Sequence, residues 1–181
     1  MEPVTLWTIG HSNRTLEQFT ELLASQKIEL LADVRRFPGS RRLPHFNQEN
    51  LSPSLAAAGI EYVHFPELGG RRKALADSPN NAWRNEAFRG YADFMMTSEF
   101  RAGIDRLLGL AQQKRTAIMC AEALWWQCHR SLIADYLKAA GHHVFHIMSA
   151  TKTDAHPFTS AARMVDGKLS YSVESEPQFL F

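Results

Sequence analysis

The sequence has few cysteines, no long apolar run and almost no net charge. Its 181 residues contain two cysteines, too few for the disulfide framework of a small secreted domain. No stretch approaches the length of about 18 apolar residues that a membrane-spanning helix needs, and the first residues lack the features of a secretory signal. The net charge of +1 excludes a generally basic polyanion-binding protein. We therefore expect a cytoplasmic protein without a membrane partner.

The hydrophobic pattern predicts an α/β fold. The chain length suits one hydrophobic core, so we expect a single domain over residues 1–181. Short apolar segments that alternate with amphipathic helical patterns are typical of a mostly parallel sheet covered on both faces. We predict a three-layer domain with about five strands flanked by helices, and Asp166-Gly167 between apolar residues indicates an additional C-terminal hairpin. The predicted strands are residues 4–10, 28–34, 60–66, 116–121 and 143–148.

Polar residues follow four of these strands. Because the carboxyl ends of parallel strands meet at one edge of a sheet, where ligands usually bind, these residues are expected to share a site. A purely structural role for each residue alone is about equally plausible, but their common placement favours a site. The residues singled out at the strand ends are His11, Ser12, Asp33, Arg35, Gly69, Cys120 and Glu122.

The segment Met119–Ser131, "MCAEALWWQCHRS", contains both cysteines. Cys128 is expected near the first turn of a helix, where free backbone amides, the helix dipole and the neighbouring His129 and Arg130 favour a thiolate. This predicts a reactive Cys128 of low pKa. Cys120 is either its chemical partner or a buried space-filling residue.

Zinc binding is the less favoured interpretation of these cysteines. Thiolate and imidazole are preferred zinc ligands, so Cys120, Cys128, His129 and His11 are the residues that such a site would use. Their spacing does not match paired cysteine knuckles, and adjacent residues at a helix start point in different directions. We predict no metal site, and the sequence leaves the cofactor and the oligomeric state open.

A second cluster, "VRRFPGSRRLPHF", carries four arginines and no acid. Arginine side chains bind phosphate or carboxylate with paired hydrogen bonds, the nearby glycines allow close backbone approach, and Phe37 offers a face on which a base could stack. The cluster favours an anionic small molecule or nucleic acid as the partner.

The motifs together resemble a known family. "TIGHSNRT", "LADVRRFPGSRR", "YVHFPELGG", "CAE", "CHRSLIADYL" and "HPF" occur in the order found in the uncharacterised family known as domain of unknown function 488. The resemblance extends over nearly the whole chain but implies no reaction. The family positions that it identifies are His11, Ser12, Asp33, Arg35, Pro38, Ser40, Leu68, Gly69, Cys120, Glu122, Cys128, His129 and Arg130.

Three functions agree with this pattern. The first is a cysteine-dependent enzyme acting on a phosphate-containing or nucleotide-like substrate, with Cys128 as nucleophile or redox thiol and Glu122, Asp33 or His11 in acid–base roles. The second is a non-catalytic nucleotide or nucleic-acid binding module. The third is a structural cluster in which the cysteines only fill space. We expect the first. The residues predicted to bind substrate are Ser12, Arg35, Ser40, Gly69, Cys120, His129 and Arg130.

Overall fold

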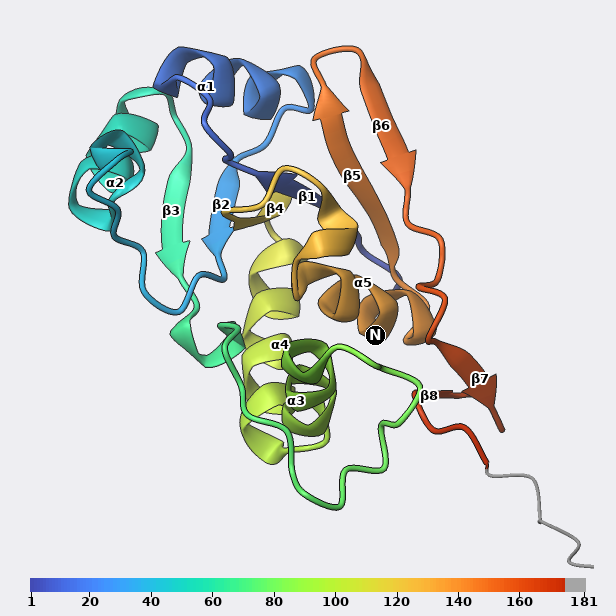
Figure 1. Cartoon of the computed structure of the whole chain (residues 1–181). Helices are drawn as coiled ribbons and strands as arrows, with labels where there is room; N and C mark the ends of the chain where they lie inside the picture. The colour runs from blue at the N-terminus through green and yellow to red at the C-terminus, as the bar shows by residue number, and fades with distance from the viewer. Residues whose placement is uncertain (175–181) are drawn as a thin grey trace, which may run out of the picture.

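The computed structural model describes residues 1–174 and consists of a sheet between two layers of helices (Figure 1). The strands are β1 (Thr5–Gly10), β2 (Leu30–Asp33), β3 (Glu61–His64), β4 (Thr116–Cys120), β5 (His143–Ser149), β6 (Lys152–Ala155), β7 (Arg163–Val165) and β8 (Lys168–Ser170). The α-helices are α1 (Leu16–Ser25), α2 (Gln48–Ala57), α3 (Glu86–Met95), α4 (Ser98–Ala111) and α5 (Arg130–Ala139). Short 3-10 helices cover Pro44–Phe46, Pro66–Leu68 and Trp125–Gln127.

The main sheet has the strand order β3-β2-β4-β1-β5-β6. The five predicted strands are present and parallel, whereas β6 pairs with β5 in the antiparallel direction. The sequence did not reveal β6 because "KTDA" is polar and none of the residues of this edge strand is buried. The central position of β4 and β1 brings the ends of β2, β4 and β1 together at one edge.

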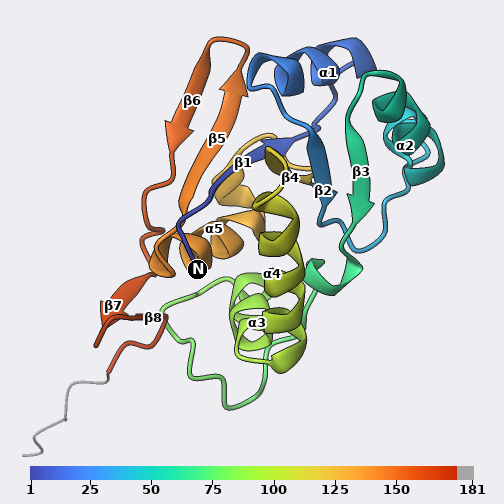
Figure 2. The same cartoon turned by 180° about the vertical axis from the view of Figure 1, so that it is seen from behind.

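Helices cover both faces of this sheet, as predicted. Helices α1 and α2 lie on one face, and α3, α4 and α5 lie on the other (Figures 1 and 2). Strand β4 shows why. Its Ala117 and Met119 belong to the hydrophobic core under α1 and α2, and its Ile118 and Cys120 belong to the core under α3, α4 and α5. This period of two is what a strand buried on both faces produces. Cys120 therefore points toward the same layer as α5.

The C-terminal hairpin is also confirmed. Strands β7 and β8 pair in the antiparallel direction, and Asp166 and Gly167 between them have φ values of 51° and 74°. Two consecutive left-handed residues are the requirement of a tight hairpin turn, and Asp-Gly meets it at low cost. Among residues 1–174, no helix is long and apolar enough to span a bilayer.

Candidate functional site

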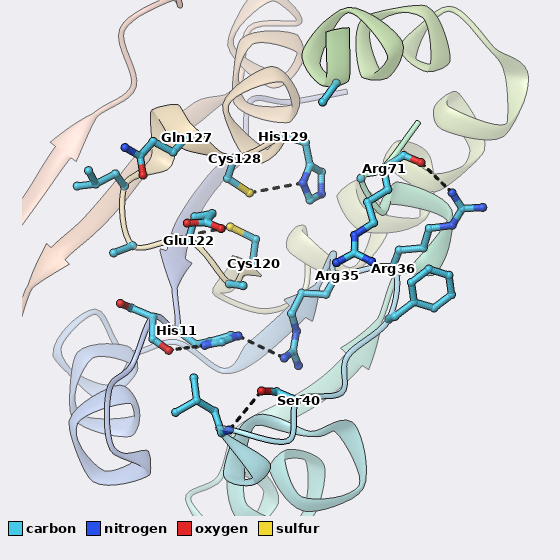
Figure 3. Close-up of a pocket in the computed structure, with 18 of the residues that line it drawn as sticks. His11, Arg35, Arg36, Ser40, Arg71, Cys120, Glu122, Gln127, Cys128 and His129 are labelled. Carbon is cyan, nitrogen blue, oxygen red and sulfur yellow. Dashed lines mark hydrogen bonds between the residues drawn. The ribbon is translucent and has the colours of Figure 1, made fainter. Parts of the chain in front are cut away.

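A cleft of about 910 Å³ opens at the carboxyl ends of β1, β2 and β4 (Figure 3). This is the edge at which the sequence predicted a site. Three predicted residues, Asp33, Gly69 and Arg130, do not line the cleft but support residues that do. The predicted residues that line it are His11, Ser12, Arg35, Ser40, Cys120, Glu122, Cys128 and His129.

Asp33 holds Arg35 in place. The fully buried Asp33 carboxylate accepts hydrogen bonds from Nε (2.9 Å) and Nη2 (2.7 Å) of Arg35, from its backbone N–H (3.0 Å), and from the Tyr62 hydroxyl. These contacts occupy both carboxylate oxygens. Asp33 therefore positions the guanidinium, and it has no oxygen directed into the cleft for the acid–base role that the sequence suggested.

His11 is likewise committed to the structure around it. Its ring stacks on Phe46 at 4.4 Å, Nδ1 donates to the Ser12 carbonyl (2.8 Å), and Nε2 faces Arg35 Nη1 (3.4 Å). Burial away from water lowers the pKa of His11 to about 4. At neutral pH the imidazole is uncharged, with a proton on Nδ1, and its second nitrogen accepts from Arg35.

Ser40 and Gly69 shape the arginine-rich wall. The Ser40 hydroxyl accepts a hydrogen bond from the Leu43 amide (3.2 Å), which closes a turn in the loop that carries the arginines. A side chain at Gly69 would collide with Arg36, because a Cβ there would lie 2.7 Å from the Arg36 Cβ. The glycine thus allows the segment after β3 to pack directly on the segment after β2.

The two cysteines lie side by side at the floor of the cleft. Both are buried, with 2% of Cys120 and 6% of Cys128 exposed, and the Cys120 thiol donates to the Glu122 carbonyl (3.8 Å). Cys128 lies near the start of α5, as expected, but outside the helix itself, which begins at Arg130 with His129 as its N-cap. The 3-10 turn Trp125–Gln127 leaves Cys128 extended, with φ −133° and ψ 151°.

The expected low pKa belongs to Cys120 rather than Cys128. Burial and the contact with Cys120 raise the pKa of Cys128 well above its ordinary value. Burial also opposes ionisation of Cys120, but the Cys128 thiol, the charge of Arg130 and the backbone of Glu122 lower its pKa below the usual value. Of the two thiols, Cys120 is the one that ionises more readily.

Arg130 supplies the positive charge behind this pair. Only 2% of Arg130 is exposed, and its Nη2 donates to the carbonyl oxygens of Glu122 (2.9 Å) and Ala123 (3.0 Å). Its Nε and Nη1 have no partner among residues 1–174, and no carboxylate there forms an ion pair with it. A buried charge without a counterion is costly. The charge of Arg130 in turn lowers the pKa of the Cys120 thiol.

His129 lies beside the Cys128 thiol. Its Nε2 lies 3.0 Å from the Val34 carbonyl oxygen, to which it must donate, so Nδ1 is the unprotonated nitrogen in the neutral ring. Burial lowers the pKa of His129 to about 4, which keeps the ring neutral. Nδ1 lies 3.5 Å from Cys128 Sγ. His129 is therefore placed to accept the Cys128 proton.

The loop between Cys120 and Cys128 is fixed at two points. A side chain at Gly10 would collide with the Glu122 carbonyl, so the loop backbone lies directly on β1 there. The Trp125 indole stacks on the His146 ring, with centroids 4.6 Å apart and planes 5° from parallel. Together these contacts hold Glu122 and Cys128 over the sheet.

His146 belongs to a buried polar chain that the sequence analysis did not find. Asp135 accepts from His156 Nε2 (2.8 Å), His156 Nδ1 meets His146 Nε2 (2.8 Å), and His146 Nδ1 meets the Thr8 hydroxyl (2.5 Å). Burial and the neighbouring His156 lower the pKa of His146 to about 2. The chain connects α5, β5 and β1 beneath the cleft. The "HPF" motif, which contains His156, was its only signal in the sequence.

Positive charge dominates the open walls of the cleft. The exposed residues Arg36, Arg42 and Arg71 line it together with Arg35, against a single acid, Glu122. Arg71 has a left-handed φ of 59°, an uncommon conformation for a residue with a side chain that often marks functional sites. Within residues 1–174, no three His, Cys, Asp or Glu side chains are grouped to hold a metal ion.

The fold and the site define an α/β protein with a buried dithiol beneath an arginine-lined cleft. Residues 15–137 match the sequence model of the family described as domain of unknown function DUF488. The chain therefore belongs to this family, as the motifs suggested. No curated protein and no solved structure matches the chain.

Proposed function

We propose that this protein is a cysteine-dependent enzyme that acts on a phosphate-containing, nucleotide-like substrate. One observation carries the proposal: a thiol pair with its own buried counter-charge opens into the same cleft as four arginines. A thiolate is the reactive form of cysteine, and arginines bind phosphate oxygens in pairs. The cleft thus offers a nucleophile and an anion-binding wall within reach of one small molecule.

The side chains divide into three tasks in this proposal. Cys120 is the nucleophile, in place of Cys128. Arg36, Arg42 and Arg71 bind the phosphate, since Asp33 already neutralises Arg35. Glu122 is the acid–base group, because its exposed carboxylate lines the cleft and makes no hydrogen bond to residues 1–174.

A non-catalytic nucleotide or nucleic-acid binding module is the second candidate. Phe37 favours it, because its ring is 68% exposed at the cleft wall, with the Arg36 guanidinium 5.7 Å from the ring centroid. An aromatic face beside an arginine suits a stacked base. In this case the thiols contribute nothing to function, and Cys120→Ser leaves nucleotide binding unchanged.

Calorimetric titration of the full chain with AMP and with inorganic pyrophosphate tests the anion-binding wall. We expect the double variant Arg36→Ala/Arg71→Ala to bind at least about tenfold more weakly, because each charge-assisted hydrogen bond contributes on the order of 1.5–3 kcal/mol. Arg101→Ala is the matched control, since Arg101 is exposed and lies outside the cleft. Equal affinity of the double variant and this control would reject the proposed wall.

A further inference from the structure

The thiol pair has an arrangement that binding an anion does not require. The two side chains lie side by side in the cleft, although Cys120 ends β4 and Cys128 precedes α5. Both line the cleft and so face its opening. Figure 3 shows the two side chains pointing toward one another, with His129 beyond Cys128. A residue pair that only filled space would not need a proton acceptor beside one thiol and a buried cation near the other.

We propose that Cys120 and Cys128 are a peroxide-reactive pair in which Cys120 is oxidised and Cys128 resolves it as an intramolecular disulfide. The inference goes beyond the proposed function and does not depend on anion binding. Cys120 is influenced by the buried Arg130 charge, and two nitrogens of that guanidinium have no hydrogen-bond partner among residues 1–174. Cys128 has the unprotonated Nδ1 of His129 to take its proton.

The chemistry proceeds in two balanced steps. In the first, the Cys120 thiolate attacks one peroxide oxygen, so that an S–O bond forms, the O–O bond breaks and hydroxide leaves; Cys120 becomes a sulfenic acid. In the second, Cys128 sulfur attacks Cys120 sulfur while His129 Nδ1 accepts the thiol proton. The S–S bond forms, the S–OH bond breaks, and the departing hydroxide takes up that proton. Two thiols and one hydrogen peroxide thereby give one disulfide and two waters.

Hydrogen peroxide added to the full chain, without phosphate or nucleotide, tests this inference. We expect peptide mass spectrometry under non-reducing conditions to show a Cys120–Cys128 disulfide that dithiothreitol reverses. In Cys128→Ser, Cys120 should accumulate as a sulfenic acid that dimedone traps. In Cys120→Ser, Cys128 should react at least about tenfold more slowly, because little of it is ionised at neutral pH. His129→Gln should prolong the lifetime of the sulfenic acid.

Whether peroxide forms a Cys120–Cys128 disulfide is tested with the wild-type chain alone, so the result does not depend on whether the variants fold. Two free thiols after peroxide treatment, or disulfides only between separate chains, would overturn the inference. Equal peroxide reactivity of the two single-cysteine variants would overturn the assignment of Cys120 as the first residue oxidised. Because no anion is present, failure of the anion-binding wall leaves this result unaffected, and the two proposals can fail separately.

Discussion

Arg130→Met is expected to reduce the alkylation rate of Cys120 at neutral pH by about tenfold or more, because each unit of increase in a thiol pKa lowers the thiolate fraction about tenfold. The guanidinium charge favours ionisation of Cys120. Methionine matches much of its length but carries no charge. The rate of iodoacetamide labelling, followed against pH by mass spectrometry, should rise at a higher pH in the variant than in the wild type.

The same substitution should change stability much less than reactivity. Replacing a buried charge with an apolar side chain of similar size is often neutral, because the desolvation cost of the charge disappears as well. The carbonyls of Glu122 and Ala123 lose a donor, which offsets part of that gain. Arg101→Met is the control and should label at the wild-type rate. An unchanged pH profile in Arg130→Met would show that this guanidinium is not the counter-charge of Cys120.

Asp33→Asn is expected to lower the free energy of unfolding by about 3–5 kcal/mol, the usual cost of removing one partner of a buried ion pair. The carboxylate is fully buried, and the Arg35 side chain is only 10% exposed. The amide keeps the shape of Asp33 but supplies one acceptor oxygen where Arg35 and Tyr62 now use two. Urea unfolding followed by circular dichroism measures the change.

Glu67→Gln provides the matched control for this prediction. The Glu67–Arg106 pair is also a contact between a carboxylate and a guanidinium, at 2.6 Å, but its side chains are 24% and 48% exposed. Exposed pairs contribute about 0–1 kcal/mol. If Asp33→Asn lowers the free energy of unfolding no more than Glu67→Gln does, the buried Asp33–Arg35 pair does not hold the carboxyl end of β2 in place.

The sequence predicted the fold and the place of the cleft because both depend on local pattern. Parallel strands have apolar runs of recognisable length, and the switch-point rule then located the cleft. Strand β6 lacked such a run and was missed. The rule also counts every polar residue at a strand end alike, so it could not separate Arg35, which faces the cleft, from Asp33, which lies beneath it.

The chemistry of individual residues depended on details that no spacing reveals. Cys128 was assigned the thiolate because its helix was expected to begin two residues earlier than it does. The lowered pKa of Cys120 depends in part on Arg130, which turns inward toward the loop carbonyls rather than out toward solvent. His146 and His156 are remote from the cleft motifs in sequence, and only the pairing of β5 with β1 brings His146 opposite Thr8.

The parallel stack of Trp125 on His146 gives the cleft an intrinsic optical reporter. Indole emission depends on the surroundings of the ring, and Trp125 lies in the loop that carries Glu122 and connects the two cysteines. If oxidation of the thiols or occupation of the cleft moves this loop, the indole leaves the imidazole and meets water. Tryptophan emission should then shift to longer wavelength, and Trp125→Phe should abolish the shift. The protein can thus report the state of its own cleft without an attached label.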